Sequence, residues 1–308
     1  MEIVFILDYV KILSCGDYMI YSNSYYKYYI IIPITLAIIS ILALPYLPKA
    51  VDITGGTSIS AVVPVSVNVD DKQIISALSD LNLRDLSVSV AENPLSNQKM
   101  YLVEFAPIKK EDNATSVNVE IKRRLAGLLG ISESDINVQE IGPTIGKMFW
   151  ESGLRALVFA FLFMGAVVFL TFRELAPSTY VISAAILDVL YALLGMVIFR
   201  IPLSLATLAA MLMLIGYSVD TDILLTNKVI KRKEGDVDSR IASAMKTGLT
   251  MTGTTLTALI VMTLAAWMLH TQTLVWIGAT LTFGLVGDLI STWLMNAVIL
   301  KWWVTRKS

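Results

Sequence analysis

Six apolar runs, each about as long as a bilayer-crossing helix, constrain this sequence more than any other feature. A helix needs about 20 consecutive apolar residues to cross the hydrocarbon layer. Only 16% of the 308 residues are charged, whereas a typical soluble domain has about a quarter. The sequence therefore predicts an α-helical membrane protein with six transmembrane helices. The runs cover 29–48, 149–170, 178–199, 203–227, 247–269 and 273–300.

Lysine and arginine in the short connections predict the orientation, because such loops are enriched in these residues on the cytoplasmic side. The loop 228–246 and the C-terminal tail are the basic segments. With six spans, that loop, the N-terminal segment 1–28 and the tail 304–308 share one side, which we expect to be the cytoplasm. The five later spans then form a bundle over 147–303 in the cell membrane.

The N-terminal segment 1–28 has a short apolar stretch from Ile3 to Leu13, which Asp8 and Lys11 interrupt. This pattern predicts an interfacial helix or a disordered tail and is too short for a further span. Glu2 stands where a signal peptide has basic residues, so we expect the first span to be an uncleaved anchor.

A polar stretch of about a hundred residues, 49–146, separates the first two spans, and we expect it to form one domain outside the cell. Its periodicity alternates between the two-residue repeat of strands and the longer repeat of helices. The resulting order is β-α-β-β-α-β, which is the ferredoxin-like arrangement in an α+β domain. The expected elements are a strand over 52–63, a helix over 70–81, strands over 86–90 and 100–105, a helix over 117–129 and a strand over 136–141.

Several classes of function lack the residues that they need. The chain has one cysteine, Cys15, and one histidine, His270, so it can form neither an internal disulfide nor a zinc cluster of such ligands. A net charge of −1 gives no basic field for nucleic acid. No nucleophile–base set or phosphate loop is visible. We therefore predict no enzyme activity, no cofactor and no metal.

Four carboxylates lie within the expected spans: Asp188, Asp220, Asp222 and Asp288. Each costs about 2.5–3.5 kcal/mol at a helix centre on insertion scales. Such residues usually face a bundle interior or a water-filled cavity and often carry protons. We take them as proton-relay candidates. The alternative is that they only accept hydrogen bonds from nearby Thr, Ser and Tyr.

Helical geometry separates two of these carboxylates. Residues two apart lie about 200° around a helix, so Asp220 and Asp222 cannot both face one neighbour. We expect one to face the bundle and the other to reach cytoplasmic water. Thr226 lies four residues from Asp222 and shares its face, which makes it a further candidate. Arg155 could pair with an aspartate, although snorkelling to the interface explains it as well.

Four motifs in this order resemble the SecF family of protein-export membrane proteins. The first follows the first span, the second precedes the second span, and the last two lie in the third and fourth spans. The matching residues are Asp52, Gly55, Gly56 and Thr57; Gly142 and Pro143; the run 188–195; and Gly216, Tyr217 and Ser218. The run 219–222 departs from the bacterial pattern, whereas Asp288 and 247–255 are similar to the archaeal form.

This resemblance implies six spans, a ferredoxin-like external domain and membership of the resistance-nodulation-division superfamily, in which proton flow is common. It implies pairing with SecD, assistance to a SecYEG-type channel and contact with exported, unfolded polypeptides. Asp188 matches a position of the family's proton path.

Two other functions stay open on the residues alone. The chain could be half of a proton-coupled exporter of small solutes or lipids, since such exporters usually have twelve spans and two external domains. It could also be a structural scaffold whose carboxylates never titrate.

Overall fold

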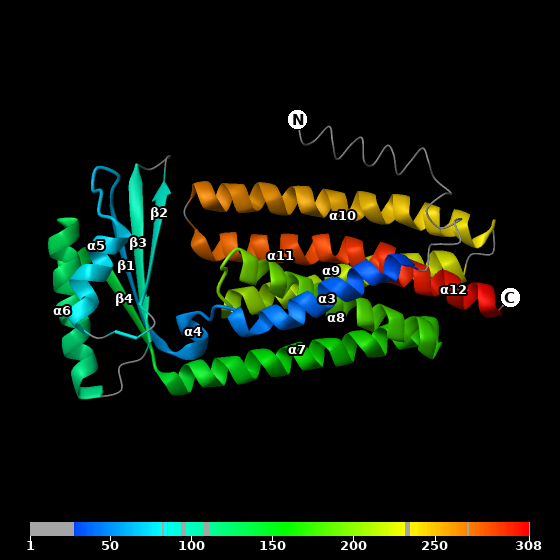
Figure 1. The fold of residues 1–308 in the computed structure, drawn as a ribbon, viewed down its shortest axis with the longest axis horizontal. Coiled ribbons are helices and arrows are strands. Elements are labelled where there is room, and N and C mark those ends of the chain that lie inside the picture. Colours follow the sequence, from blue (N-terminus) through cyan, green and yellow to red (C-terminus); the bar gives the residue numbers. More distant parts are fainter. Residues whose placement is uncertain are drawn as a thin grey trace.

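The structure is a computed structural model that describes residues 28–81, 83–84, 86–93, 97–106, 111–231, 235–269 and 271–307. The expectation for the N-terminal segment lies outside these residues except at Tyr28, and His270 also lies outside them. Figure 1 shows two parts, a long bundle of helices and a smaller α/β domain at one of its ends.

The prediction of six membrane-spanning helices is confirmed. Among the described residues, six helical segments are long and apolar enough to cross a membrane. The last segment consists of two helices joined by a π-helical turn, Ser291–Asn296. The segments are Tyr28–Tyr46, which contains α3 (Ile31–Ala43); α7 (Pro143–Phe172); α8 (Leu175–Ile198); α9 (Leu205–Ile230); α10 (Val237–Met268); and Gln272–Arg306, built from α11 (Gln272–Ile290), the π turn and α12 (Ala297–Lys307).

Two helices extend beyond their apolar runs. α7 begins at Pro143, because proline is favoured in the first helical turn, where its missing N–H costs nothing. α10 begins at Val237, because the Asp236 side chain accepts a hydrogen bond from the Ser239 N–H and caps the helix. The stretch 237–246, which the sequence placed in a polar loop, is therefore helical.

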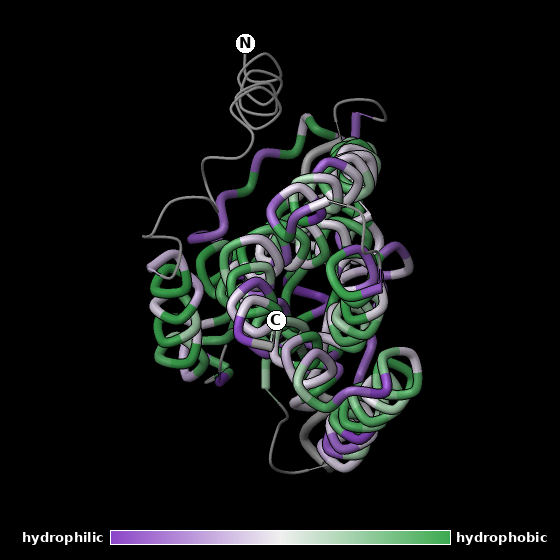
Figure 2. Tube along the Cα trace, turned by 90° about the vertical axis from the view of Figure 1, so that its right-hand side faces the viewer, coloured by the Kyte–Doolittle hydropathy of each residue, from purple (hydrophilic) through white to green (hydrophobic). Residues whose placement is uncertain are grey.

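Helices α8 and α9 form the centre of the bundle, together with α11. About half of the apolar window of α8 and of α9 is buried, 50% and 56%, against 6% for α7 and 17% each for α10 and the first span. Figure 2 looks along the bundle and shows hydrophobic segments on the helices around its circumference. The peripheral helices therefore present their apolar side chains outward, as lipid requires.

The α/β domain has the predicted order β-α-β-β-α-β, so the fold class is confirmed. Its four strands form one antiparallel sheet in the order β2-β3-β1-β4. Helices α5 (Asp71–Leu78) and α6 (Glu111–Leu129) cover one face, and the other face is turned toward the bundle (Figure 1). The strands are β1 (Gly56–Pro64), β2 (Ser87–Asn93), β3 (Gln98–Phe105) and β4 (Ile136–Ile141).

The first strand begins later than expected. Residues Val51–Thr54 form a short helix, α4, and β1 starts at Gly56. The cause lies in two glycines, Gly55 at φ +74° and Gly56 at φ +146°, which turn the chain through conformations that side chains disfavour. Val51 and Ile53 are buried on this helix. The alternation of apolar and polar residues that predicted a strand here therefore comes from a single helical turn.

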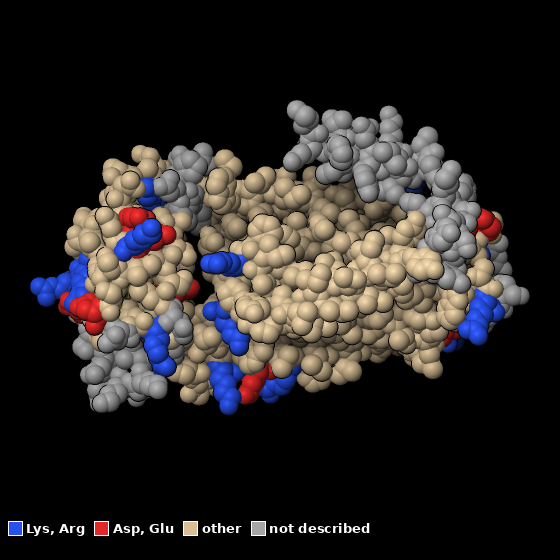
Figure 3. All heavy atoms as spheres, viewed as in Figure 1, with Lys and Arg blue, Asp and Glu red and all other residues tan. Residues whose placement is uncertain are grey.

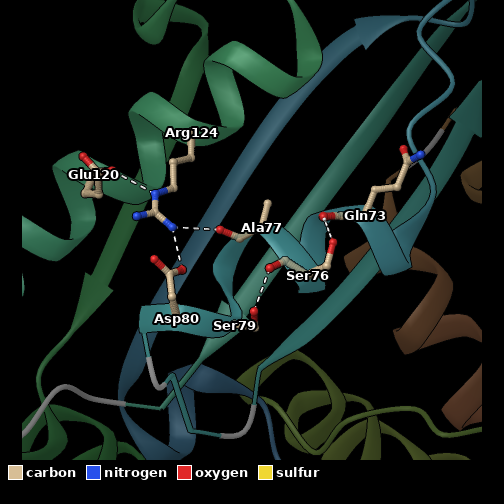
Figure 4. Close-up of polar contacts among 7 residues, drawn as sticks. All are labelled: Gln73, Ser76, Ala77, Ser79, Asp80, Glu120 and Arg124. Atoms are coloured by element: carbon tan, nitrogen blue, oxygen red, sulfur yellow. Dashed lines mark hydrogen bonds and ion pairs between the residues drawn. The ribbon is translucent and has the colours of Figure 1, made fainter.

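Arg124 ties the two helices of the domain together (Figure 4). Its Nη1 donates to the Ala77 carbonyl at 2.9 Å and to Asp80 at 2.6 Å, and its Nε donates to Glu120 at 2.8 Å. The hydrogen bond from Arg124 lowers the pKa of Asp80. Exposed ion pairs contribute little free energy, so this contact chiefly fixes how α5 lies on α6.

Replacing Tyr101 with phenylalanine is expected to loosen the sheet. The buried Tyr101 hydroxyl donates to the Val69 carbonyl at 3.0 Å and accepts from the Val69 N–H at 3.2 Å. Its loss leaves two polar groups of Val69 without their partner, which costs about 1–3 kcal/mol. Hydrogen exchange of the intact chain should show weaker protection in β1 and β3. The same substitution at Tyr46, which is 79% exposed, should leave protection unchanged.

Candidate functional site

Three of the four candidate carboxylates meet inside the bundle. Asp188 of α8, Asp222 of α9 and Asp288 of α11 are each fully buried. They belong to the three central helices. A change at one carboxylate therefore acts on the contacts between these helices.

Asp188 accepts hydrogen bonds on both of its carboxylate oxygens. Ser218 of α9 donates to one oxygen, and Ser291 of the π turn donates to the other. Asp188 therefore joins α8 to both neighbouring helices. Ser218, which the sequence identified only as part of a motif, is a direct partner of this carboxylate.

The π turn supplies the remaining partners. Asn296 Nδ2 donates to Asp222 Oδ1 at 2.6 Å. The Thr292 hydroxyl lies 3.0 Å from the same oxygen and 3.1 Å from Asp288 Oδ1. π-Helical turns inside α-helices are rare and frequent at functional sites. Here the turn brings Ser291, Thr292 and Asn296 onto the carboxylates.

Thr292 cannot donate to both carboxylates at once. A threonine hydroxyl has one hydrogen and can otherwise only accept. Both short contacts are hydrogen bonds only if one of the two carboxyl groups carries a proton and donates it to Thr292 Oγ1. The arrangement thus suits an Asp222–Asp288 pair that holds one proton between them.

No cation neutralises this cluster among the described residues, since none of the ion pairs found there includes Asp188, Asp222 or Asp288. Arg155 lies exposed on α7, where its Nε donates to the Glu151 carbonyl at 3.1 Å. The same part of the chain contains no group of three metal-ligating side chains placed to hold an ion.

The other two relay candidates lie apart from these bonds. Thr226 is buried one turn from Asp222, and its hydroxyl has no hydrogen-bond partner among the described residues. Asp220 lies on the exposed side of α9. Gly216 and Tyr217 share that side, and a side chain added at Gly216 would meet nothing within 4 Å.

The remaining motif residues build the junction between the domain and the bundle. Asp52 Oδ2 accepts a hydrogen bond from the Leu205 N–H at 2.7 Å, at the first residue of α9. Gly55 lies against Pro143 so closely that a Cβ would sit 2.7 Å from the proline Cα. Gly142 is the N-cap of α7. The buried Thr57 follows in β1.

Two carboxyl groups at this junction have raised pKa values. Burial raises the pKa of Asp52, although its hydrogen bond from Leu205 acts in the opposite direction. Burial also raises the pKa of Glu104 of β3, and the neighbouring charge of Asp52 adds to this effect. Ionising either group therefore weakens the junction.

We expect the Glu104→Gln variant to lose part of the pH dependence of stability. A carboxyl group whose pKa is raised on folding contributes stability at low pH, and that contribution is lost as the pH rises through the raised value. As the pH falls from neutral to the ordinary glutamate pKa of 4.5, the midpoint of thermal unfolding of the native chain should therefore rise relative to that of the variant. Parallel curves for the two proteins would contradict the prediction.

Comparison with known proteins identifies the family. Residues 121–306 match the family described as protein export membrane protein SecD/SecF, C-terminal. The protein-export membrane protein SecF of Methanocaldococcus jannaschii is 39% identical over 288 residues, which cover 91% of this chain and 96% of the relative. SecF of Thermococcus gammatolerans is 34% identical over 86% of this chain and 80% of its own length.

The fold also matches a crystal structure of SecDF, a translocon-associated membrane protein from Thermus thermophilus. The TM-score is 0.67 at 16% identity, and the match covers 92% of this chain but 38% of the SecDF chain. The architecture of helices and sheet is thus shared with part of a larger protein. Together with the sequence matches, this means that the chain belongs to the SecF family of protein-export membrane proteins.

Proposed function

We propose that this chain works with SecD beside a SecYEG-type channel, and that protons moving through the buried carboxylates drive its assistance to export. The proposal assigns it no catalytic reaction. The observation that supports it most is the single Thr292 hydroxyl between Asp222 and Asp288.

A hydroxyl in this position can relay a proton. A protonated Asp288 transfers its proton to Thr292 Oγ1, and the threonine hydroxyl releases its own hydrogen to Asp222. The reverse transfer restores the first state. Asp188 lies next to this pair, accepts hydrogen bonds from Ser218 and Ser291, and would be the third proton-carrying group. Moving one proton across the whole membrane potential releases about 2.3 kcal/mol per 100 mV, and a step between two neighbouring carboxylates uses a fraction of that energy.

The proton transfer would change the hydrogen bonds that join three packed helices. Asp188, Asp222 and Asp288 bind across α8, α9 and the π turn, so each protonation state favours a different set of these hydrogen bonds. A two-state rearrangement of packed helices is how a local proton change can reach a distant domain. α9 is also bonded to the domain through Leu205 and Asp52.

The outward side of α9 supports a partner within the membrane. Asp220 is a carboxylate on an exposed side of a spanning helix, which is costly in contact with lipid. Gly216 on the same side lets another helix approach closely. We assign this surface to SecD.

We also propose the topology that the basic connections indicate. The segment 1–28, the loop between α9 and α10 and the tail 304–308 lie in the cytoplasm. The domain over 49–146 lies outside, and 147–303 forms the membrane bundle. Lys228 and Lys301 near the proposed cytoplasmic ends bind Thr247 and Asp238.

The Asp188→Asn variant tests the proton mechanism. We expect export into membrane vesicles to lose its stimulation by a proton gradient while the export seen without a gradient stays the same, because asparagine keeps the shape but cannot carry a proton. Co-purification of the variant with SecD is the control for folding. If gradient stimulation is unchanged, Asp188 has no place in the coupling path.

A further inference from the structure

A groove runs between the open face of the sheet and the end of the bundle. It consists of two adjoining cavities of about 750 Å³ and about 190 Å³, which share Val51, Glu104 and Trp276 in their walls. The larger lies beneath β2 and β3, and the smaller beneath β1 and β4. Figure 3 shows the gap between the two parts, with basic side chains on the bundle side.

The roof of the groove is one row of polar side chains across all four strands. Ser87 pairs with Glu104, Glu104 with Ser58, and Ser58 with Gln139, and all four residues line the two cavities. Three gaps between strands of about 4.8 Å give the row a length of roughly 14 Å, which about four residues of extended chain would span. Hydroxyl and amide groups along such a row can bond to peptide groups.

The floor of the groove is apolar and comes from the bundle. It contains Val275, Trp276 and Phe283 of α11 and Phe199, which follows α8. Phe199 stacks on Phe283 at 4.7 Å between ring centroids and is still 63% exposed. Aromatic walls with a few placed polar groups are typical of binding pockets.

The groove carries both signs of charge. Lys49 and Arg200 line the larger cavity, and no ion pair found among the described residues uses either of them. Asp52 and Glu104 line the smaller one, where Asp52 Oδ1 is buried without a hydrogen-bond partner in the same part of the chain. A phosphate headgroup would meet these two carboxylates. A polypeptide offers N–H donors, carbonyl acceptors and apolar side chains in alternation, which matches roof and floor.

We propose that this groove binds an extended segment of about four residues of the exported polypeptide. The inference rests on the proposed role in export and adds a place where the client is held. The main chain bonds to the Ser87–Gln139 row, and alternate apolar side chains rest on Phe199 and Trp276. We expect the groove to bind without sequence preference, because all exported polypeptides have peptide groups and apolar side chains.

Photocrosslinking in intact vesicles tests the proposal. A benzophenone amino acid replaces Ser89 or Gln139 in the groove, or Arg123 on the exposed side of α6 as the control. The probe is a secretory precursor arrested in the channel by a folded C-terminal domain. We expect adducts at the two groove positions to exceed those at the control about tenfold, because binding raises the local concentration of the client. Equal yields, or adducts with lipid alone, would overturn the proposal.

A blocking pair gives the functional readout. Ser89→Trp places a bulky side chain in the larger cavity, which Ser89 lines. Ser60→Trp places the same side chain on the same sheet face, at a residue that lines neither cavity. Export should slow at least threefold only in the first, with both variants retaining SecD. Equal rates would overturn the groove as a client site. A different outcome is that the groove crosslinks form although vesicles without this chain export at the same rate. That outcome would overturn the proposed function and leave the groove as a polypeptide site.

Discussion

Replacing Gly146 with alanine is expected to break the junction between the external domain and the bundle. A Cβ at this position would lie 2.6 Å from the Gly55 nitrogen and 2.8 Å from the Ile53 carbonyl oxygen. These are backbone atoms, so no side chain can move aside. Within a helix, alanine normally stabilises by about 1 kcal/mol relative to glycine. Here the clash must exceed that gain, and overpacking of this kind costs about 1–3 kcal/mol or more.

The matched control is Gly127→Ala in α6, where an added Cβ meets nothing within 4 Å. We expect this variant to be slightly more stable than the native chain and Gly146→Ala to be less stable. Limited proteolysis of the intact protein should cut near 49–56 and 141–146 in Gly146→Ala alone. Equal resistance of the two variants would show that the two glycine motifs do not lock the junction.

The pattern of apolar runs was enough to predict the six spans and the order of elements in the domain, because burial in lipid and in a sheet leaves strong periodicities. It could not place α4. Val51 and Ile53 alternate as a strand would, and the adjacent Gly55 and Gly56 mark only a turn. That turn lies against α7 through the close contact of Gly55 with Pro143. That contact joins residues almost ninety positions apart, and no local pattern encodes it.

The sequence predicted the carboxylates of the candidate site but not most of their hydrogen-bond partners. Asp188, Asp222 and Asp288 stand out because carboxylates are rare in spans. Their partners Ser291, Thr292 and Asn296 do not stand out, since hydroxyl residues are common in membrane helices. The spacing of three and four residues from Asp288 to Ser291 and Thr292 was an available signal. The π turn that also turns Asn296 inward has no recognisable sequence pattern here.

The Thr292→Val variant is expected to have the sharpest effect on the proposed relay. Valine has the shape of threonine without the hydroxyl, so the helix packing is kept and the bridge between Asp222 and Asp288 is lost. A hydrogen bond to a charged group contributes about 1.5–3 kcal/mol, and each 1.4 kcal/mol is a factor of ten. Gradient-stimulated export should therefore fall at least about tenfold, while export without a gradient stays the same.

Thr280→Val is the matched control, because Thr280 is buried in α11 of the same spanning segment and its hydroxyl has no hydrogen-bond partner among the described residues. It should leave gradient stimulation intact. Thr292→Ser, which restores a hydroxyl, should recover most of the loss. A Thr292→Val protein that is still fully stimulated would mean that protons do not pass between Asp222 and Asp288 through this residue. Equal losses in both valine variants would mean that this last spanning segment tolerates no such change, and the relay would then lose its main support.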